Sequence, residues 1–226
     1  GIISVTLFSY CYFTTVINVE AGIAASLLYT SPVFVMLFSA VLFRERITAQ
    51  KIAAIVLTVS GVALVSGMLG SSALGALDLI IGIGAGLFYS LYSIFGVYAL
   101  RKYSSLTVTF YTFLLGTIGF LFMTNPIAII EKTASNPVVI PMEIGLALFN
   151  GLLPYLFYTI GLGHTDASVA GVLVAVEPLV GCLVGIFVFH ESVNPAKLIG
   201  IALILSAIVL LNIRLSHKST AKEIPA

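Results

Sequence analysis

TSPVFVMLFSAVLFRERITAQK, residues 30–51, aligns without a gap on VEPLVGCLVGIFVFHESVNPAK, residues 176–197, at a shift of 146 residues. The matched pairs include Pro32 with Pro178, Glu45 with Glu191 and Lys51 with Lys197. The register continues outward, where Tyr12 meets Tyr158, Ala21 meets Ala167 and Ser60 meets Ser206. A register kept through helices and the loops between them favours duplication of one unit over chance similarity between apolar segments.

The composition indicates that the chain uses lipid as its solvent. It is 60% hydrophobic and 8% charged, and its mean hydropathy is +1.17 over 226 residues. A soluble domain carries about a quarter charged residues, so this chain cannot cover a surface that faces water. Its formal net charge of +1 offers no basic field for nucleic acid. We therefore expect an all-α polytopic membrane protein whose partners are the lipid bilayer and a small molecule.

Apolar runs long enough to cross a bilayer fill nearly the whole chain, since a helix of about 20 apolar residues spans the hydrocarbon core. The eight predicted spans are residues 2–19, 21–43, 50–69, 76–99, 104–124, 142–163, 167–189 and 196–213. Five spans separate each element of the repeat from its copy, so the two copies cross the membrane in opposite directions. Inverted repeats of this kind are the architecture of many secondary transporters.

The repeat also predicts how the chain is divided. The second copy contains two spans, 76–99 and 104–124, that have no counterpart before the first copy. We therefore expect eight visible helices of a ten-helix protein. The predicted parts are the last three helices of the first unit (1–69), a second unit of five helices (70–214) and a disordered tail (215–226).

Fixed positive charges are unequal on the two predicted sides of the membrane. One side carries Arg44, Arg46, Lys51, Arg101, Lys102, Arg214, Lys218 and Lys222, and the other carries Lys132 and Lys197. Because Lys and Arg accumulate in cytoplasmic loops, we expect a multi-pass protein of the cell membrane with a cytoplasmic C-terminus.

Each copy of the repeat combines a short hairpin, two alanines three residues apart, a leucine, a proline and a glutamate at the helix end. The copies read EAGIAASLLYTSPVFVMLFSAVLFRERIT (20–48) and DASVAGVLVAVEPLVGCLVGIFVFHESVN (166–194). This pattern resembles the EamA family of the drug/metabolite transporter superfamily. The resemblance implies ten helices in two inverted five-helix units around a central cavity, and movement of small metabolites, often amino acids, usually outward.

Glu177 is the ionisable side chain expected at mid-membrane, where an ionised carboxylate costs about 2.5–3.5 kcal/mol on insertion scales. Its helical face carries small residues such as Ala170 and Gly181, which predicts that it points into the bundle. It binds a substrate amine or titrates with a coupling proton, or it is a structural carboxyl bonded to a tyrosine or to backbone. The matching position is Ser31, and both precede a proline, so paired helix breaks indicate a central site.

Further candidate ligand groups lie on other spans. Tyr89 and Tyr92 offer hydroxyls and aromatic faces to an apolar or cationic ligand, or make ordinary hydrogen bonds between helices. Asn150 and Pro154 indicate another helix break, where the amide binds substrate or repairs the kinked backbone.

Glu45 and Glu191 close matched helices just before turns. A carboxylate opposes the dipole at a helix C-terminus, so each needs a basic neighbour or the N–H groups of the next helix. Their presence in both copies predicts that they fix the loops.

A secondary transporter is therefore the expected function, with alternating access around a site near Ser31, Tyr89, Asn150 and Glu177. The competing functions are an intramembrane enzyme, which needs a nucleophile and base or metal ligands at membrane depth, and a passive channel, which needs rings of charge. The sequence favours neither, so we expect no enzyme activity, cofactor or metal centre. The resemblance favours export, and Glu177 is the candidate for proton coupling.

Overall fold

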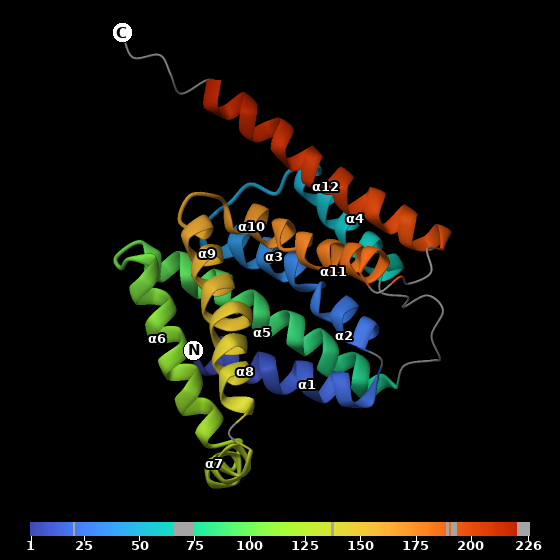
Figure 1. The fold of residues 1–226 in the computed structure, drawn as a ribbon. Helices are drawn as coiled ribbons and strands as arrows, with labels where there is room; N and C mark the ends of the chain where they lie inside the picture. Colours follow the sequence, from blue (N-terminus) through green and yellow to red (C-terminus); the bar gives the residue numbers. More distant parts are fainter. Residues whose placement is uncertain (20, 66–74, 137, 189, 191–193, 221–226) are drawn as a thin grey trace.

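The computed structural model describes residues 1–19, 21–65, 75–136, 138–188, 190 and 194–220. These residues form helices and connecting turns (Figure 1). The elements in chain order are η1 (Ile2–Leu7), α1 (Phe8–Asn18), α2 (Ala21–Leu28), α3 (Ser31–Leu42), α4 (Ala49–Val65), α5 (Ala76–Leu100), α6 (Ser105–Leu121), α7 (Pro126–Ser135), α8 (Val139–Gly145), η3 (Leu146–Leu152), α9 (Leu153–Leu162), α10 (Ala167–Leu173), α11 (Val176–Phe187) and α12 (Pro195–Thr220).

Helices occupy every predicted span as far as the chain is described, but they differ in length. Those long and apolar enough to cross a membrane are Gly22–Leu42, Ala76–Leu100, Val139–Leu162 and Ala167–Val184. Shorter apolar helices cover Ile2–Asn18, Ala49–Val65 and Pro195–Leu211. The 17 residues of α4 extend about 25 Å at 1.5 Å per residue, somewhat less than the hydrocarbon core. The number of spans therefore stays a prediction.

Two of the long helices are broken at matching places. The α2–α3 helix is interrupted at residues 29–30 and the α10–α11 helix at residues 174–175, in both cases just ahead of a proline. Because Pro32 and Pro178 have no N–H group, neither can donate the helical bond to the carbonyl four residues back. In Figure 1 the two broken helices run in opposite directions.

The helices α4 and α12 lie against each other in opposite directions (Figure 1) and approach closely. A Cβ built on Gly61 would lie 2.9 Å from the carbonyl oxygen of Gly200, and one built on Gly200 would lie 2.7 Å from the carbonyl oxygen of Gly61. About two helical turns away on the same faces, Ala54 and Ala207 are fully buried in one apolar cluster. Small side chains at these positions let the two backbones meet.

The core joins residues from both ends of the chain. One cluster combines Tyr29 and Val62 with Ala175, Leu179 and Ile204, and another combines Val35 with Ile94, Leu162, Ala167 and Ala170. The predicted parts 1–69 and 70–214 therefore share one apolar interior and do not pack as separate bodies.

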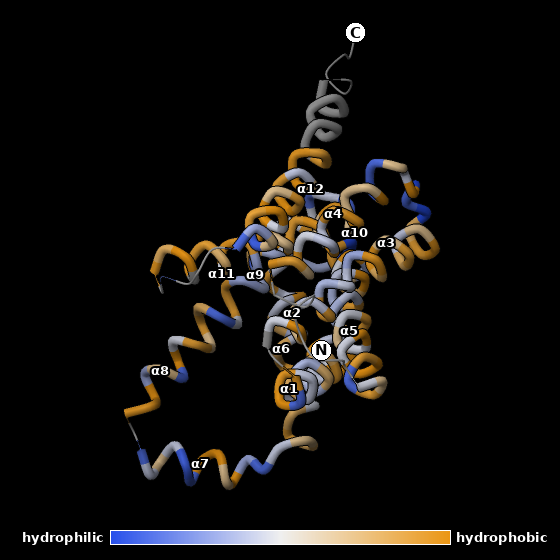
Figure 2. The backbone as a smooth tube through the Cα atoms, turned by 90° about the vertical axis from the view of Figure 1, so that its right-hand side faces the viewer, coloured by the Kyte–Doolittle hydropathy of each residue, from blue (hydrophilic) through white to orange (hydrophobic). Residues whose placement is uncertain are grey.

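The segment between α6 and α9 extends away from the other helices (Figure 2). Helix α7 is bent by 98° relative to α6, and the residues of α7, α8 and η3 are not buried. A bend close to a right angle is the geometry that a connection along a membrane surface requires.

At the C-terminus, α12 continues to Thr220, so the first part of the predicted disordered tail 215–226 is helical. Extending an existing helix costs little, because each added residue gains a backbone bond, and the next proline comes only at Pro225. Residues 221–226 lie outside the described residues.

Candidate functional site

Glu177 stands in the first turn of α11, just after the break in its helix. The hydroxyl of Tyr29 donates a hydrogen bond to its Oε2 at 2.9 Å. Tyr29 lies at the matching break between α2 and α3 and is 5% exposed. The two helix breaks therefore meet, and one contributes the acid while the other contributes its hydroxyl partner.

More tyrosines surround the carboxylate. Tyr12, Tyr89 and Tyr155 each interact electrostatically with Glu177. They come from α1, α5 and α9, so three helices and the α2–α3 break each contribute a tyrosine to one region. A carboxylate among aromatic rings and hydroxyls suits an ammonium group, which a carboxylate pairs with and an aromatic face attracts. Tyr29, Tyr12 and Tyr155 were not predicted as site residues, although Tyr12 and Tyr158 match in the repeat.

Tyr92 has a different role from Tyr89. It is buried, and its hydroxyl shares a hydrogen bond of 2.5 Å with Thr159 Oγ1. Beside it, Ser93 Oγ and Tyr158 OH are 2.7 Å apart. These contacts join α5 to α9, as the structural alternative for Tyr92 predicts. Tyr89 is half-buried, with its ring centroid 5.1 Å from that of Phe8.

One prediction about the face of Glu177 needs correction. The carboxylate points toward Tyr29 of the other broken helix, but its side chain is exposed, and a Cβ at Gly181 on the same predicted face would have nothing within 4 Å. In α10 every residue from Ala167 to Val172 is buried, whereas α11 packs through the face of Leu179, so the face that carries Ala170, at 4% exposure, is no longer enclosed at Glu177. Ser31, at the start of α3, is buried at 4% exposure.

The helix break predicted at Asn150 and Pro154 is absent from the structure. The helix continues from Val139 to Leu162, and residues 146–152 widen into a π-helical segment, η3. Pro154 cannot donate to the carbonyl of Asn150, and a wider turn accommodates that lost bond. Asn150 is exposed on η3, and among the described contacts none joins it to Glu177. The structure therefore does not bring Asn150 to this site.

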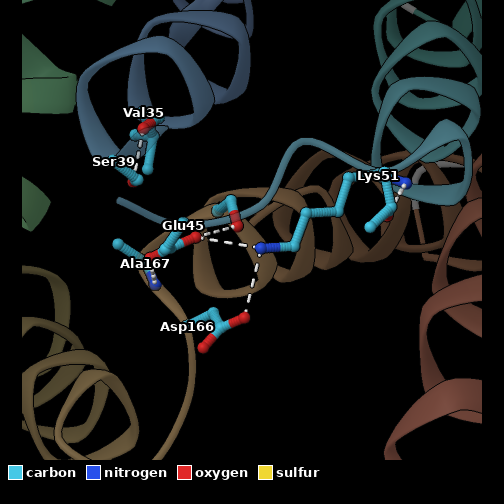
Figure 3. A network of polar contacts seen from close by, with 8 residues as sticks. Val35, Ser39, Glu45, Lys51, Asp166 and Ala167 are labelled. Atoms are coloured by element: carbon cyan, nitrogen blue, oxygen red, sulfur yellow. Dashed lines mark hydrogen bonds and ion pairs between the residues drawn. The ribbon is translucent and has the colours of Figure 1, made fainter. Parts of the chain in front are cut away.

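Glu45 forms a separate polar cluster at the other end of α10 (Figure 3). Its Oε1 accepts from the backbone N–H of Ala167 at 3.1 Å, and its Oε2 accepts from Ser168 Oγ at 2.5 Å. Lys51 Nζ lies 2.9 Å from Glu45 Oε2 and 3.1 Å from Asp166 Oδ2. The basic neighbour is as predicted, but the N–H group belongs to α10 and not to the next helix, α4. Glu191 lies outside the described residues.

The turn after α3 positions this carboxylate. Arg44 takes a left-handed conformation with φ 55°, and the N–H of Glu45 then bonds back to the carbonyl of Ser39 at 3.2 Å. A left-handed residue after the last turn is a common way to end a helix. His190 has φ 53°, and it is the position that matches Arg44 at the shift of 146 residues.

A cavity of about 480 Å³ lies between η1, α5 and α6. Tyr92, Phe95, Tyr103 and Tyr111 are among its walls, whereas Glu177 is not. Within the described ranges, no group of three or more His, Cys, Asp or Glu side chains could hold a metal ion.

Comparison with known proteins places these features in a family. The model of the EamA-like transporter family matches residues 1–67 and 77–213. An uncharacterized transporter of Archaeoglobus fulgidus is 30% identical over 199 residues, which cover 88% of this chain and 70% of the relative. The threonine/homoserine exporter RhtA of Escherichia coli K12 is 24% identical over 221 residues, covering 96% and 70%.

A protein of known crystal structure has the same fold. It superposes with a TM-score of 0.73 at 18% sequence identity, and the match covers 93% of this chain and 75% of that one. At this level of identity the likeness concerns the arrangement of the helices alone.

Proposed function

The chain belongs to the EamA-like transporter family, a family of polytopic membrane proteins, and we propose that it is a secondary exporter of amino acids or related small amines. A relative named as a threonine/homoserine exporter supports the direction and the substrate class. The observation that carries the proposal is the Glu177 carboxylate, which is exposed at a helix break and bonded to Tyr29 across from it.

We further propose that the chain works as two inverted units. The matched helix breaks and the matched left-handed residues Arg44 and His190 support this arrangement. The α4–α12 contact supports it too, because a two-fold operation with the 146-residue shift converts the pair Gly61 and Gly200 into the pair Ala207 and Ala54. The contact between helices α4 and α12 thus maps onto itself and lies on the axis, so this contact is the natural pivot for rocking.

In this proposal Glu177 alternates between the substrate amine and a proton. Tyr29 holds the carboxylate, Tyr89 offers an aromatic face, and Ser31 lies at the opposing break. Exchange of an amine for a proton at one carboxylate couples the two fluxes without any other charged group. Because positive residues such as Arg44 and Arg101 gather on one side, we place that side and the C-terminus in the cytoplasm of a cell-membrane protein.

Export of threonine and homoserine by cells tests the proposal. Cells that express the protein are loaded with a dipeptide of either amino acid, and the amino acid released into the medium is measured. Glu177→Gln should abolish release, because the amide keeps the size but loses the charge that pairs with an amine. Glu131→Gln is the matched control, since Glu131 is an exposed acid on α7. Equal release by wild type and Glu177→Gln would refute the role of this carboxylate.

A further inference from the structure

We infer that Glu45, Lys51 and Asp166 form a latch that holds the Arg44 side of the protein closed and opens in each transport cycle. This inference rests on the proposed function, because only an alternating-access cycle requires the latch to open. The latch is defined by these three side chains and by the N-terminus of α10 that Glu45 caps.

The latch joins the two predicted units. Glu45 and Lys51 belong to the first unit. The second unit contributes the start of α10, which comprises Asp166, Ala167 and Ser168. Glu45 bonds to a residue 122 positions along the chain. A contact of this kind at one end of the bundle must separate when the units rock apart at that end.

The chemistry of the latch favours a strong closed state. Asp166 stands at the N-cap of α10 but makes no cap bond with its side chain. Its carboxylate binds Lys51, and Glu45 caps the helix in its place. Lys51 and Glu45 belong to the same unit, so the bonds that cross between the units are those of Glu45 to Ala167 and Ser168 and that of Lys51 to Asp166. The Glu45 side chain is 15% exposed, so water screens its crossing bonds only in part, whereas Asp166 is 49% exposed. Charge-assisted bonds between partly buried groups are the stronger class of hydrogen bond.

An apolar plug lies beneath the latch. It consists of the buried cluster Val35, Ile94, Leu162, Ala167 and Ala170, which unites α3, α5, α9 and α10. At its rim, the guanidinium of Arg101 lies 5.3 Å from the ring centroid of Phe43 and 5.1 Å from that of Tyr98. Polar and cation–π contacts thus join the ends of α3, α5 and α10 next to the buried apolar plug.

The other side of Glu177 is open by comparison. Glu177 lies ten residues beyond Ala167, about 15 Å along a helix. Its side chain is exposed, and Val180, three residues on and on the same helical face, is 49% exposed. The structure therefore combines a sealed Arg44 side with an acid that the fold leaves unenclosed, and the latch would require this asymmetry.

Thiol labelling from each side of the membrane tests the latch. In a background where Cys11 and Cys182 are replaced by alanine, one reporter is Ala170→Cys in the plug and the other is Val180→Cys near Glu177. Each reporter is combined with Lys51→Met, and membrane-impermeant maleimide is supplied from the Arg44 side for position 170 and from the opposite side for position 180.

Loss of the latch should change the two labelling rates in opposite directions. The thiol at 170 should react about tenfold faster, the factor that corresponds to about 1.4 kcal/mol in a two-state equilibrium, and the thiol at 180 should react more slowly. Arg46→Met is the matched control, because Arg46 is an exposed cation of the same loop outside the latch. Glu45→Gln is the second variant if Lys51→Met does not insert, since it keeps the acceptor for Ala167.

Two other results would overturn the latch. Unchanged rates at both positions would show that Lys51 does not hold a gate. A faster rate at 170 with an unchanged rate at 180 would show local loosening of α10, which is what a purely structural cap predicts. Labelling needs no substrate, so it tests the latch independently of the substrate class. If the two labelling rates shift in opposite directions but the protein releases no threonine or homoserine, the latch hypothesis stands and the proposed substrate class is refuted.

Discussion

Adding one methyl group to Gly200 should destabilise the protein, because the backbone of α4 occupies the space that the methyl group needs. A Cβ at this position would lie 2.7 Å from both the Gly61 carbonyl oxygen and Val65 Cγ2, and 3.0 Å from Leu64 Cβ. The carbonyl belongs to helix backbone and cannot rotate away, so α4 and α12 must separate by a few tenths of an ångström along their whole contact.

The cost follows from two opposing effects. Overpacking a close contact costs about 1–3 kcal/mol. Replacing glycine by alanine within a helix returns about 0.5–1 kcal/mol of backbone entropy. The net loss for Gly200→Ala is therefore between about 0 and 2.5 kcal/mol, with a central value of about 1 kcal/mol, which lowers Tm by about 2–4 °C for a chain of this length.

The same substitution elsewhere provides the control. Gly161 in α9 has nothing within 4 Å of a built Cβ, so Gly161→Ala receives the entropic gain without the clash. We expect its Tm to rise by about 1–4 °C. Thermal unfolding of both variants in one detergent compares the two shifts, and a Tm for Gly200→Ala at or above wild type would refute the close α4–α12 contact.

Three further predictions follow from the polar contacts. Exchanging Glu45 and Lys51 should not give a functional latch, since a cation would then face the N-terminus of α10. Export by the Glu45→Lys/Lys51→Glu variant measures this, and export at the wild-type level would indicate a simple ion pair. Arg44→Gly should be tolerated while Arg44→Val lowers Tm by about 2–4 °C, because φ 55° costs a β-branched residue about 1 kcal/mol or more. Tyr29→Phe should reduce export at least several-fold without loss of insertion, since it removes the hydroxyl that orients Glu177; unchanged transport kinetics would exclude that role.

Local patterns in the sequence predicted the helices and both breaks before Pro32 and Pro178. These features depend on composition and on the missing N–H group of proline, which are properties of a few adjacent residues. The contacts of Glu45 were predictable from the sequence only in part. Dipole electrostatics required a partner for that carboxylate, and Lys51 is close in sequence, but nothing local indicates that the N–H group comes from Ala167.

The packing of one helix face was the main source of error. A face predicted to pack from Ala170 to Gly181 needs neighbours along its whole length, but Ala170 is enclosed in α10 whereas a Cβ at Gly181 in α11 would have nothing within 4 Å. At Asn150 a break was predicted, but a wider turn absorbed the missing proline bond and kept the helix continuous. Proline thus predicts that backbone bonding changes, whereas the surrounding packing decides whether the helix breaks or widens.

The proposed inverted repeat accounts for one acid at the meeting breaks and not two. Tyr29 and Ala175 occupy matching positions at the shift of 146 residues and lie in the same buried cluster, with Ala175 fully buried. A pair that maps onto itself sits on the two-fold axis, where two large side chains cannot fit, so a tyrosine in one copy requires a small residue in the other. The next matched polar pair, Ser31 and Glu177, follows the same logic for charge, because two carboxylates close together in a medium of low dielectric constant repel each other and one takes up a proton. In the proposed two-fold arrangement the two copies must therefore differ at the axis, where the first supplies a hydroxyl donor and the second a carboxylate, and this difference gives the asymmetric site that the proposed binding of one amine requires.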